Sequence, residues 1–169
     1  MRIFILDDEP SIVDVLSKVC VRSGHDVATA VVSTDALDYL SKNAVDLLVA
    51  DISMPPPDGL QVIREVRVSQ PNMVALAMTG YLTRYSLADI QAAGASDLIY
   101  KPLRMDEFRA RIAFADQQRR VVEGLNVRRR ELQQMSADMI KGLQEELEEL
   151  RKSVRQSRPP HPPSDPTSS

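Results

Sequence analysis

The sequence predicts an α/β domain built on a parallel β-sheet and followed by a long C-terminal helix. Over the first 104 of the 169 residues, short apolar runs bounded by turn residues alternate with segments of helical periodicity. Such alternation is typical of buried parallel strands joined by helices. From about Met105 no proline occurs until Pro159, and apolar side chains recur at steps of three and four residues. This second pattern indicates a continuous helix.

Five strand–helix units are expected in the first 104 residues. Their strands are expected at 3–6, 27–31, 45–50, 73–78 and 98–100. The first helix is expected to begin at Pro10, where a missing N–H costs nothing, and to end at Gly24. The second is expected to begin at Ser33, whose hydroxyl would cap it. The third follows the loop 52–59, and the fourth is expected at 84–93.

The bulk composition is that expected of a soluble cytoplasmic protein. No apolar stretch approaches the roughly 20 residues that span a bilayer, and the N-terminus lacks the layout of a signal peptide. The single cysteine, Cys20, lies between two valines, so an inert buried thiol is favoured over a redox role. Residues 1–104 carry 13 acidic and 9 basic side chains, net −4, which disfavours nucleic-acid binding by this part.

Acidic and polar residues stand at the ends of four expected strands. Asp7 and Asp8 follow the first, Asp51 the third, Thr79 the fourth and Lys101 the fifth. Ligands of open α/β sheets bind outside the carboxyl ends of the strands, so these side chains are expected to converge. Crowded carboxylates need a cation, and Mg²⁺ prefers oxygen ligands. With Mg²⁺ and an ammonium beside it, Asp51 is a candidate nucleophile for phosphoryl transfer.

Each of these signals has an ordinary structural explanation when taken alone. Asp7 and Asp8 can simply begin a helix, since acidic side chains are favourable in a first turn. Asp51 and Thr79 can be turn residues, and Lys101 followed by proline is a common surface dipeptide. These explanations do not account for the joint occurrence of the residues at the ends of four strands.

The motifs resemble those of the receiver domains of two-component response regulators, the CheY-like family. They are ILDDEP at 5–10, ADISMPPPDGL at 50–60, MTG at 78–80 and GASDLIYKPL at 94–103. The resemblance covers about residues 1–118. It implies a flavodoxin-like, doubly wound (βα)5 sheet of order 2-1-3-4-5. It also implies phosphorylation of Asp51 by a histidine kinase or phosphotransfer protein.

The resemblance further implies how the site binds metal. Asp8, Asp51 and the backbone carbonyl of Ser53 are expected to ligate Mg²⁺, while Asp7 acts through water. Members of the family accept a phosphoryl group and catalyse its transfer to themselves and its later loss. We therefore expect a phosphoacceptor and not a turnover enzyme.

Three other residues of the motifs are expected to handle the phosphoryl group or support the site. Thr79 is expected to hydrogen-bond a phosphoryl oxygen when the domain switches, and Lys101 is expected to pair with the same group. Pro102 matches the family's proline after the lysine, which is often preceded by a cis peptide bond in these proteins.

Two positions depart from the family pattern or bear on it. The aromatic residue that the family carries three positions before the lysine is Leu98 here. Tyr100 lies two residues later, on the same face of the sheet by strand alternation, and is expected to take part in the switch instead. Tyr81 stands near the expected site entrance, where its bulk is expected to prolong the life of a phospho-aspartate.

The rest of the chain is expected to be helix and tail. The expected parts are a receiver domain at 1–118, an extended helix or coiled coil at 119–156 and a disordered Pro/Ser-rich tail at 157–169. Fifty helical residues extend about 75 Å, too far for the domain to cover. A parallel homodimeric coiled coil is therefore expected, with a local stutter between Leu132 and Leu143. Gly124 could instead end the domain's last helix and allow a kink or hairpin.

These features favour a response regulator that signals through its long helix to a downstream protein partner, without a DNA-binding output domain. One alternative is a DNA-binding protein that uses the arginines at 128–130. It is disfavoured because Glu123 and Glu131 flank that run. Another is a dehalogenase-like phosphatase, whose nucleophile follows the first strand in a DxD pattern that Asp7 and Asp8 do not make.

Overall fold

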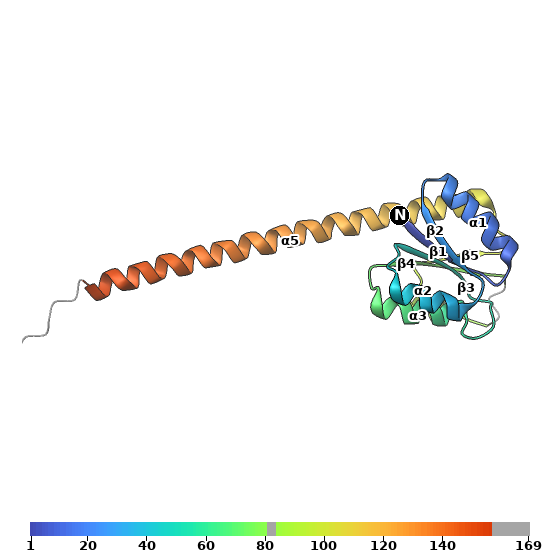
Figure 1. Ribbon diagram of the computed structural model, residues 1–169, viewed down its shortest axis with the longest axis horizontal. Coiled ribbons are helices and arrows are strands. Elements are labelled where there is room, and N and C mark those ends of the chain that lie inside the picture. Colours follow the sequence, from blue (N-terminus) through green and yellow to red (C-terminus); the bar gives the residue numbers. More distant parts are fainter. Residues whose placement is uncertain (81–83, 157–169) are drawn as a thin grey trace, which may run out of the picture. The chain divides into compact units, whose positions relative to one another are not determined.

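Five parallel strands form the central sheet, in the order β2-β1-β3-β4-β5 (Figure 1). Each neighbouring pair is hydrogen-bonded in parallel. The computed structural model describes residues 1–80 and 84–156. The predicted α/β class and strand order are confirmed.

Strands and helices alternate strictly along the chain. Their bounds are β1 Arg2–Leu6, α1 Pro10–Arg22, β2 Asp26–Ala30, α2 Ser33–Lys42, β3 Leu47–Asp51, α3 Gly59–Ser69, β4 Val74–Thr79, α4 Leu87–Ala92, β5 Asp97–Tyr100 and α5 Met105–Gln156. Within the described residues, no helix combines the length and apolarity that crossing a membrane requires.

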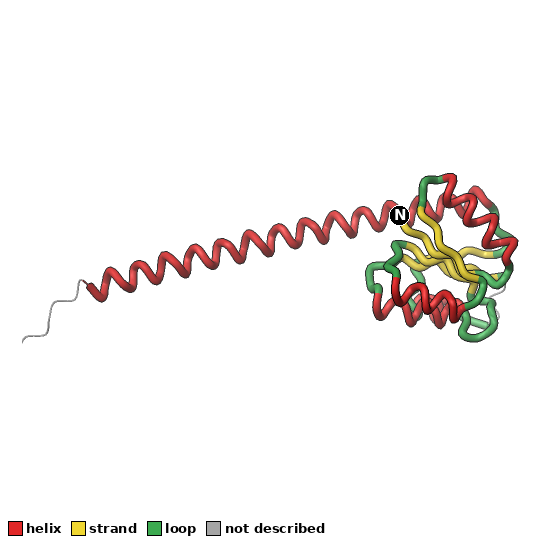
Figure 2. Tube along the Cα trace, viewed as in Figure 1, coloured by secondary structure: helices red, strands yellow, loops and turns green. Residues whose placement is uncertain are grey.

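Helices cover both faces of the sheet, because the strands carry apolar side chains on each side (Figure 2). On one face α1 and the start of α5 pack through Leu16, Cys20, Phe108 and Ile112. On the other, α2, α3 and α4 pack against a second apolar cluster that includes Phe4. Successive side chains along each strand point to opposite faces, so the sheet is covered on both sides, as in doubly wound folds. Burial raises the pKa of the Cys20 thiol to about 11, as expected of an inert cysteine.

Two strands end one residue later than the apolar runs indicated. β3 includes Asp51 and β4 includes Thr79. The ladder continues because Asp51 is still in register with Met78, and Ile52 donates its N–H to the Met78 carbonyl at 2.9 Å. Polar side chains at these positions therefore stand on regular strand backbone and not on loops. Their orientation is set by the pleat of the sheet.

The predicted cap of α2 was wrong. Ser33 is the first helical residue, Val32 is the N-cap residue, and no side chain caps the helix. The Ser33 hydroxyl is buried without a hydrogen-bond partner. The expected fourth helix was too long, because α4 begins only after Ser86, which caps it together with Asp89.

The last helix, α5, runs without interruption through Gly124 and Gly142. The alternative break at Gly124 is therefore not present, and the expected continuous helix is what the structure shows. The chain divides into a compact unit of Met1–Val122 and a second unit that begins at Glu123. In the second unit every leucine, methionine, isoleucine and valine up to Val154 is exposed. The expected disordered tail lies outside the described residues.

Candidate functional site

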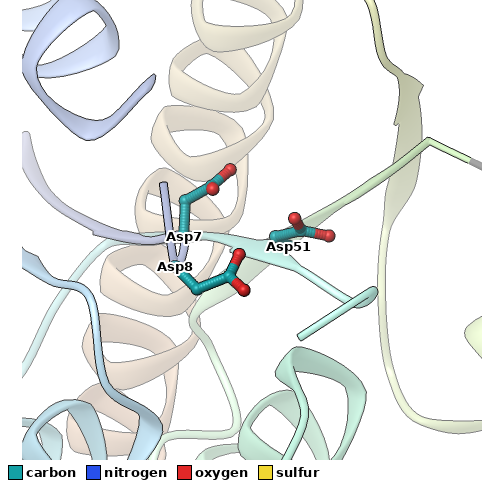
Figure 3. Close-up of side chains that lie close together, drawn as sticks. All are labelled: Asp7, Asp8 and Asp51. Atoms are coloured by element: carbon teal, nitrogen blue, oxygen red, sulfur yellow. The ribbon is translucent and has the colours of Figure 1, made fainter. Parts of the chain in front are cut away.

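Asp7, Asp8 and Asp51 gather at one edge of the sheet (Figure 3). β1 and β3 are hydrogen-bonded neighbours, with Leu6 in register with Ala50. The residues that follow these two positions are therefore brought together at the carboxyl ends of the strands. Asp7 and Asp51 are buried, while Asp8 is exposed. The predicted convergence of these carboxylates is what the structure shows.

Lys101, which follows β5, reaches across to the carboxylates. Its Nζ lies 2.6 Å from Asp51 Oδ2 and 2.8 Å from Asp7 Oδ2. The same nitrogen lies 3.6 Å from Glu9 Oε1, a contact that the sequence analysis did not anticipate. The Lys101 side chain is 14% exposed, so water screens these pairs only weakly. The Lys101–Pro102 peptide bond is cis.

Burial and charge act against each other in this cluster. Desolvation raises the pKa of Asp7 above its usual value, although contacts with Lys101 and the Glu9 N–H oppose the rise. Burial alone would lower the pKa of Lys101, but its close contacts with the Asp51 and Asp7 carboxylates outweigh this effect and the pKa is raised. The ammonium is therefore held charged, while Asp7 remains a carboxylate that is costly to keep ionised.

Asp51 is held at both oxygens. Ser53 donates its backbone N–H to Asp51 Oδ1 at 2.7 Å, and Lys101 donates to Asp51 Oδ2. The Ser53 hydroxyl lies 3.2 Å from Thr79 Oγ1. The Lys101 N–H donates to the Thr79 carbonyl at 2.8 Å, which links the end of β4 to the segment after β5. Asp7, Asp51, Thr79 and Lys101 therefore lie in one connected network, and Asp8 lies beside it.

Gly59, the first residue of α3, has a role that the sequence analysis missed. A Cβ atom at this position would lie 2.1 Å from the carbonyl oxygen of Asp51, so no other residue fits without a shift of backbone. The helix thereby begins directly against the end of β3. The Asp-Gly dipeptide at 58–59 was the available signal, because glycine allows close approach of two backbone segments.

Asp58 was also missed, although it is almost fully buried. Its Oδ1 accepts the N–H groups of Leu60 and Gln61, each at 3.0 Å, and so caps α3. Its Oδ2 accepts a short hydrogen bond from the Tyr85 hydroxyl. Asp58 therefore ties the loop after β3 to the segment that precedes α4.

The carboxylate cluster suits a hard divalent cation. One oxygen from each of Asp7, Asp8 and Asp51 lies within 4.8 Å of the others. Asp7 Oδ2 is buried and receives no hydrogen bond, although Lys101 contacts it as a charge. Oxygen donors and an excess of negative charge are what Mg²⁺ requires. The part played by the Ser53 carbonyl remains a prediction.

Leu98 and Tyr100, the two positions that bear on the family's aromatic residue, differ in their exposure. Leu98 is half-buried against the cluster beneath α2, α3 and α4. Tyr100 is 49% exposed. Ile99 between them is buried in the cluster on the opposite face. The predicted sharing of one face by Leu98 and Tyr100 thus agrees with the burial pattern. Tyr81 lies outside the described residues.

The fold and the acidic cluster agree with a comparison at the level of families. A sequence model described as "Response regulator receiver domain" matches residues 3–113. The chain belongs to this family. Its receiver domain is similar to a CheY-like response regulator receiver domain protein from Methanospirillum hungatei. That structure is 26% identical, with a TM-score of 0.64, and the match covers 70% of this chain and 96% of the other.

Curated relatives include full-length regulators. Transcriptional regulatory protein DltR of Streptococcus agalactiae (serotype III) is 29% identical over 128 residues, which are 76% of this chain and 57% of that protein. Response regulator MprA of Mycobacterium avium is 33% identical over 115 residues, 66% of this chain and 49% of that protein. The chain thus spans about half the length of the curated relatives it matches.

Proposed function

We propose that this receiver domain accepts a phosphoryl group on Asp51 from a histidine kinase or a phosphotransfer protein. The observation that carries the proposal is the setting of the Asp51 carboxylate. It is buried at the end of β3, fixed by the Ser53 N–H and the Lys101 ammonium, and adjacent to two further carboxylates. A structural aspartate does not require three ionisable neighbours at one point.

The transfer is a displacement at phosphorus. A carboxylate oxygen of Asp51 forms the new P–O bond while the N–P bond of a phosphohistidine breaks, and the histidine nitrogen takes up a proton. Lys101 offsets negative charge on the phosphoryl oxygens, because its ammonium already lies 2.6 Å from Asp51 Oδ2. Thr79 supplies a hydroxyl from the neighbouring strand end. The protein is thus a phosphoacceptor and not a turnover enzyme.

Asp8, Asp51 and the Ser53 carbonyl would hold Mg²⁺, with Asp7 supporting the ion through water. When bound, the ion neutralises charge on the carboxylates and on the incoming phosphoryl group. The family resemblance implies the outer role of Asp7, which here contacts Lys101 at 2.8 Å and accepts the Glu9 N–H at 3.0 Å. Asp8 is the exposed member of the cluster and is accessible to a hydrated ion.

A direct test is phosphorylation by acetyl phosphate with Mg²⁺, followed by intact-mass measurement. Wild-type protein is expected to gain one phosphoryl group, and Asp51→Asn is expected to gain none. Asp38→Asn is a matched control, because Asp38 is exposed on α2 and pairs there with Lys42. Equal phosphorylation of wild type and Asp51→Asn would reject the assignment.

We further propose that the output is a protein–protein interaction made by α5, in the cytoplasm, and that α5 forms a homodimer. The start of α5 is built into the sheet core through Phe108 and Ile112, while its later apolar residues are exposed. A change at Thr79 and Lys101 alters the β4–β5 edge, where Tyr100 is exposed. That edge and the start of α5 belong to the same apolar core. Phosphorylation can therefore change the conformation or the pairing of α5.

A second candidate is DNA binding, since one relative is named a transcriptional regulatory protein. The basic run at 128–130 is the feature in this chain that could serve it. Phosphate contacts make DNA affinity fall steeply with salt, so binding to duplex DNA measured from low to physiological salt tests the idea. Absence of salt-dependent binding removes this candidate.

A further inference from the structure

Glu9 is a further acidic residue at the carboxylate cluster, and its main chain is held in place at both polar groups. Glu9 is the N-cap residue of α1, with extended backbone. Its carbonyl accepts the N–H groups of Ile12 and Val13 at 3.0 and 3.2 Å. Its own N–H donates to Asp7 Oδ1 at 3.0 Å. The start of α1 and the cluster therefore fix the position from which the Glu9 side chain extends.

The side chain of Glu9 does not cap the helix that it precedes. Serine, threonine, aspartate and asparagine are preferred at the N-cap, because their short side chains reach the N–H groups of the first turn. The Glu9 side chain makes no capping hydrogen bond. Its Oε1 lies instead 3.6 Å from Lys101 Nζ. A carboxylate at the start of α1 thus contacts the ammonium that follows β5.

Lys101 contacts three carboxylates that differ in their access to water. The side chains of Asp7 and Asp51 are 0% and 4% exposed, whereas that of Glu9 is 61% exposed. The two buried contacts are the shorter ones, at 2.8 and 2.6 Å. Glu9 therefore provides the outer contact of the ammonium, on the side of the cluster that is open to solvent.

The outer contact becomes important when Asp51 is occupied by another cation. Lys101 donates to Asp51 Oδ2 at 2.6 Å, and a cation bound to the same carboxylate repels the ammonium. The ammonium is then expected to withdraw from Asp51. A half-buried ammonium without a partner is costly, but Asp7 and Glu9 still flank it. Glu9 thus lowers the free-energy cost of releasing Asp51 to the ion.

We propose that Glu9 is a positioning residue that holds the Lys101 ammonium at the solvent edge of the cluster and thereby favours Mg²⁺ at Asp8 and Asp51. Glu9 acts through Lys101 and contacts neither the ion nor the phosphoryl group. The inference deepens the proposed function and rests on it, because it concerns the metal site that is proposed to serve phosphorylation of Asp51.

Titration of the full chain with MgCl₂, followed by amide NMR shifts, tests the role of Glu9. Glu9→Gln is expected to raise the Kd for Mg²⁺ about threefold, since an exposed ion pair contributes modestly. Asp14→Asn is a matched control, because Asp14 is also an exposed acid on α1 and pairs there with Lys18. Its Kd is expected to stay within about 1.3-fold of wild type, because solvent and salt screen distant charges. Equal Kd values for wild type and Glu9→Gln would overturn the proposal.

A double-mutant cycle separates an effect through Lys101 from the plain loss of a negative charge. In a Lys101→Met background, Glu9→Gln is expected to change the Kd for Mg²⁺ by less than about 1.5-fold, because the residue through which Glu9 acts is gone. The same threefold change in both backgrounds would overturn the proposal.

Glu9→Asp gives a second decision that leaves Lys101 in place, and it decides alone should Lys101→Met not fold. This variant keeps the charge but shortens the reach toward the ammonium. It is expected to raise the Kd for Mg²⁺ at least about twofold, because the contact is lost although the charge remains. Wild-type affinity in Glu9→Asp would show that the charge alone acts, and would also overturn the proposal.

The results distinguish failure of this inference from failure of the proposed function. Mg²⁺ binding and phosphorylation of Asp51 that are both insensitive to Glu9→Gln reject only the role of Glu9. A Glu9-dependent Mg²⁺ affinity in a protein that acetyl phosphate never phosphorylates rejects only the proposed function. A wild-type protein whose amide shifts do not respond to MgCl₂ rejects the metal site and the role of Glu9 together.

Discussion

At the scale of single residues, the site depends on one ammonium shared between two buried carboxylates. Lys101 Nζ lies within 2.8 Å of both Asp7 and Asp51, and neither aspartate is open to solvent. Removing the ammonium leaves both carboxylates uncompensated in a medium of low polarity, whereas removing the Asp7 charge leaves the ammonium paired with Asp51. Bringing these groups together is therefore expected to lower the free energy of unfolding, and substitutions can measure by how much.

Lys101→Met is expected to lower the free energy of unfolding by about 3 kcal/mol, because it leaves two buried carboxylates without their counter-charge. Urea unfolding at neutral pH without divalent cations measures this. Lys42→Met removes an exposed i,i+4 pair with Asp38 and is expected to change stability by less than about 0.5 kcal/mol. Similar effects for the two variants would contradict the assigned role of Lys101.

Asp7→Asn is expected to stabilise the metal-free protein at pH 7 by about 1 kcal/mol. The pKa of Asp7 is raised in the fold, so the folded protein binds more protons just above the unfolded pKa. Stability therefore falls as pH rises through that window, and asparagine lacks this loss. Urea unfolding at pH 4 and pH 7 measures the difference. A variant less stable than wild type at pH 7 would count against this account.

At the scale of elements, α3 is the helix most firmly attached to the site. Asp58 caps it from a buried position and also holds Tyr85, while Gly59 brings its first turn against the Asp51 carbonyl. α4 has a capping box of the same kind, built from Ser86 and Asp89, but on the surface. The two caps offer a matched comparison.

Asp58→Ala is expected to destabilise the domain by about 2–3 kcal/mol, since it removes a cap and leaves the Tyr85 hydroxyl without its acceptor. Ser86→Ala removes only an exposed cap and is expected to cost about 1 kcal/mol. Thermal or urea unfolding of both variants checks the order. The reverse order would show that burial of Asp58 adds nothing to the cap.

Gly124→Ala is expected to stabilise α5 by about 1 kcal/mol, because alanine has the higher helix propensity and, apart from the nearby backbone of α5 itself, the added Cβ has no described atom within 4 Å. Circular dichroism at 222 nm during thermal unfolding measures it. Ala137→Gly, at an exposed site of the same helix, should lower stability by a similar amount. A loss of stability in Gly124→Ala would show that this glycine serves a bend.

At the scale of the whole molecule, the proposed function requires that the proposed phosphoacceptor site influence α5. Beryllofluoride with Mg²⁺, a mimic of the phosphoryl group, is expected to change the dimer dissociation constant at least severalfold. Sedimentation equilibrium with and without the mimic measures this, and Asp51→Asn should not respond. Equal dissociation constants in wild type would show that the dimer is constitutive and that the signal leaves by another surface.

Much of this could be predicted from the sequence because it depends on local pattern. The apolar runs before Asp51 and Thr79 located the strands to within a residue or two, and parallel topology then placed both side chains at one edge. The cap at Ser33 was wrong because hydroxyl side chains suit both the N-cap position and the first turn. Glu9 near Lys101 and Tyr85 on Asp58 could not be predicted, since each depends on where a distant loop returns.

The sequence by itself determined the order of strands and helices, the acidic cluster and the apolar periodicity of α5, because these follow from residue spacing and from the rule that parallel strands end at one edge. Only the tertiary structure decided that Lys101 is shared between Asp7 and Asp51, that Asp58 ties two loops together and that Gly59 touches the Asp51 carbonyl. Contacts of that kind join segments far apart in the chain. Their distances depend on how the whole core packs and not on any local pattern.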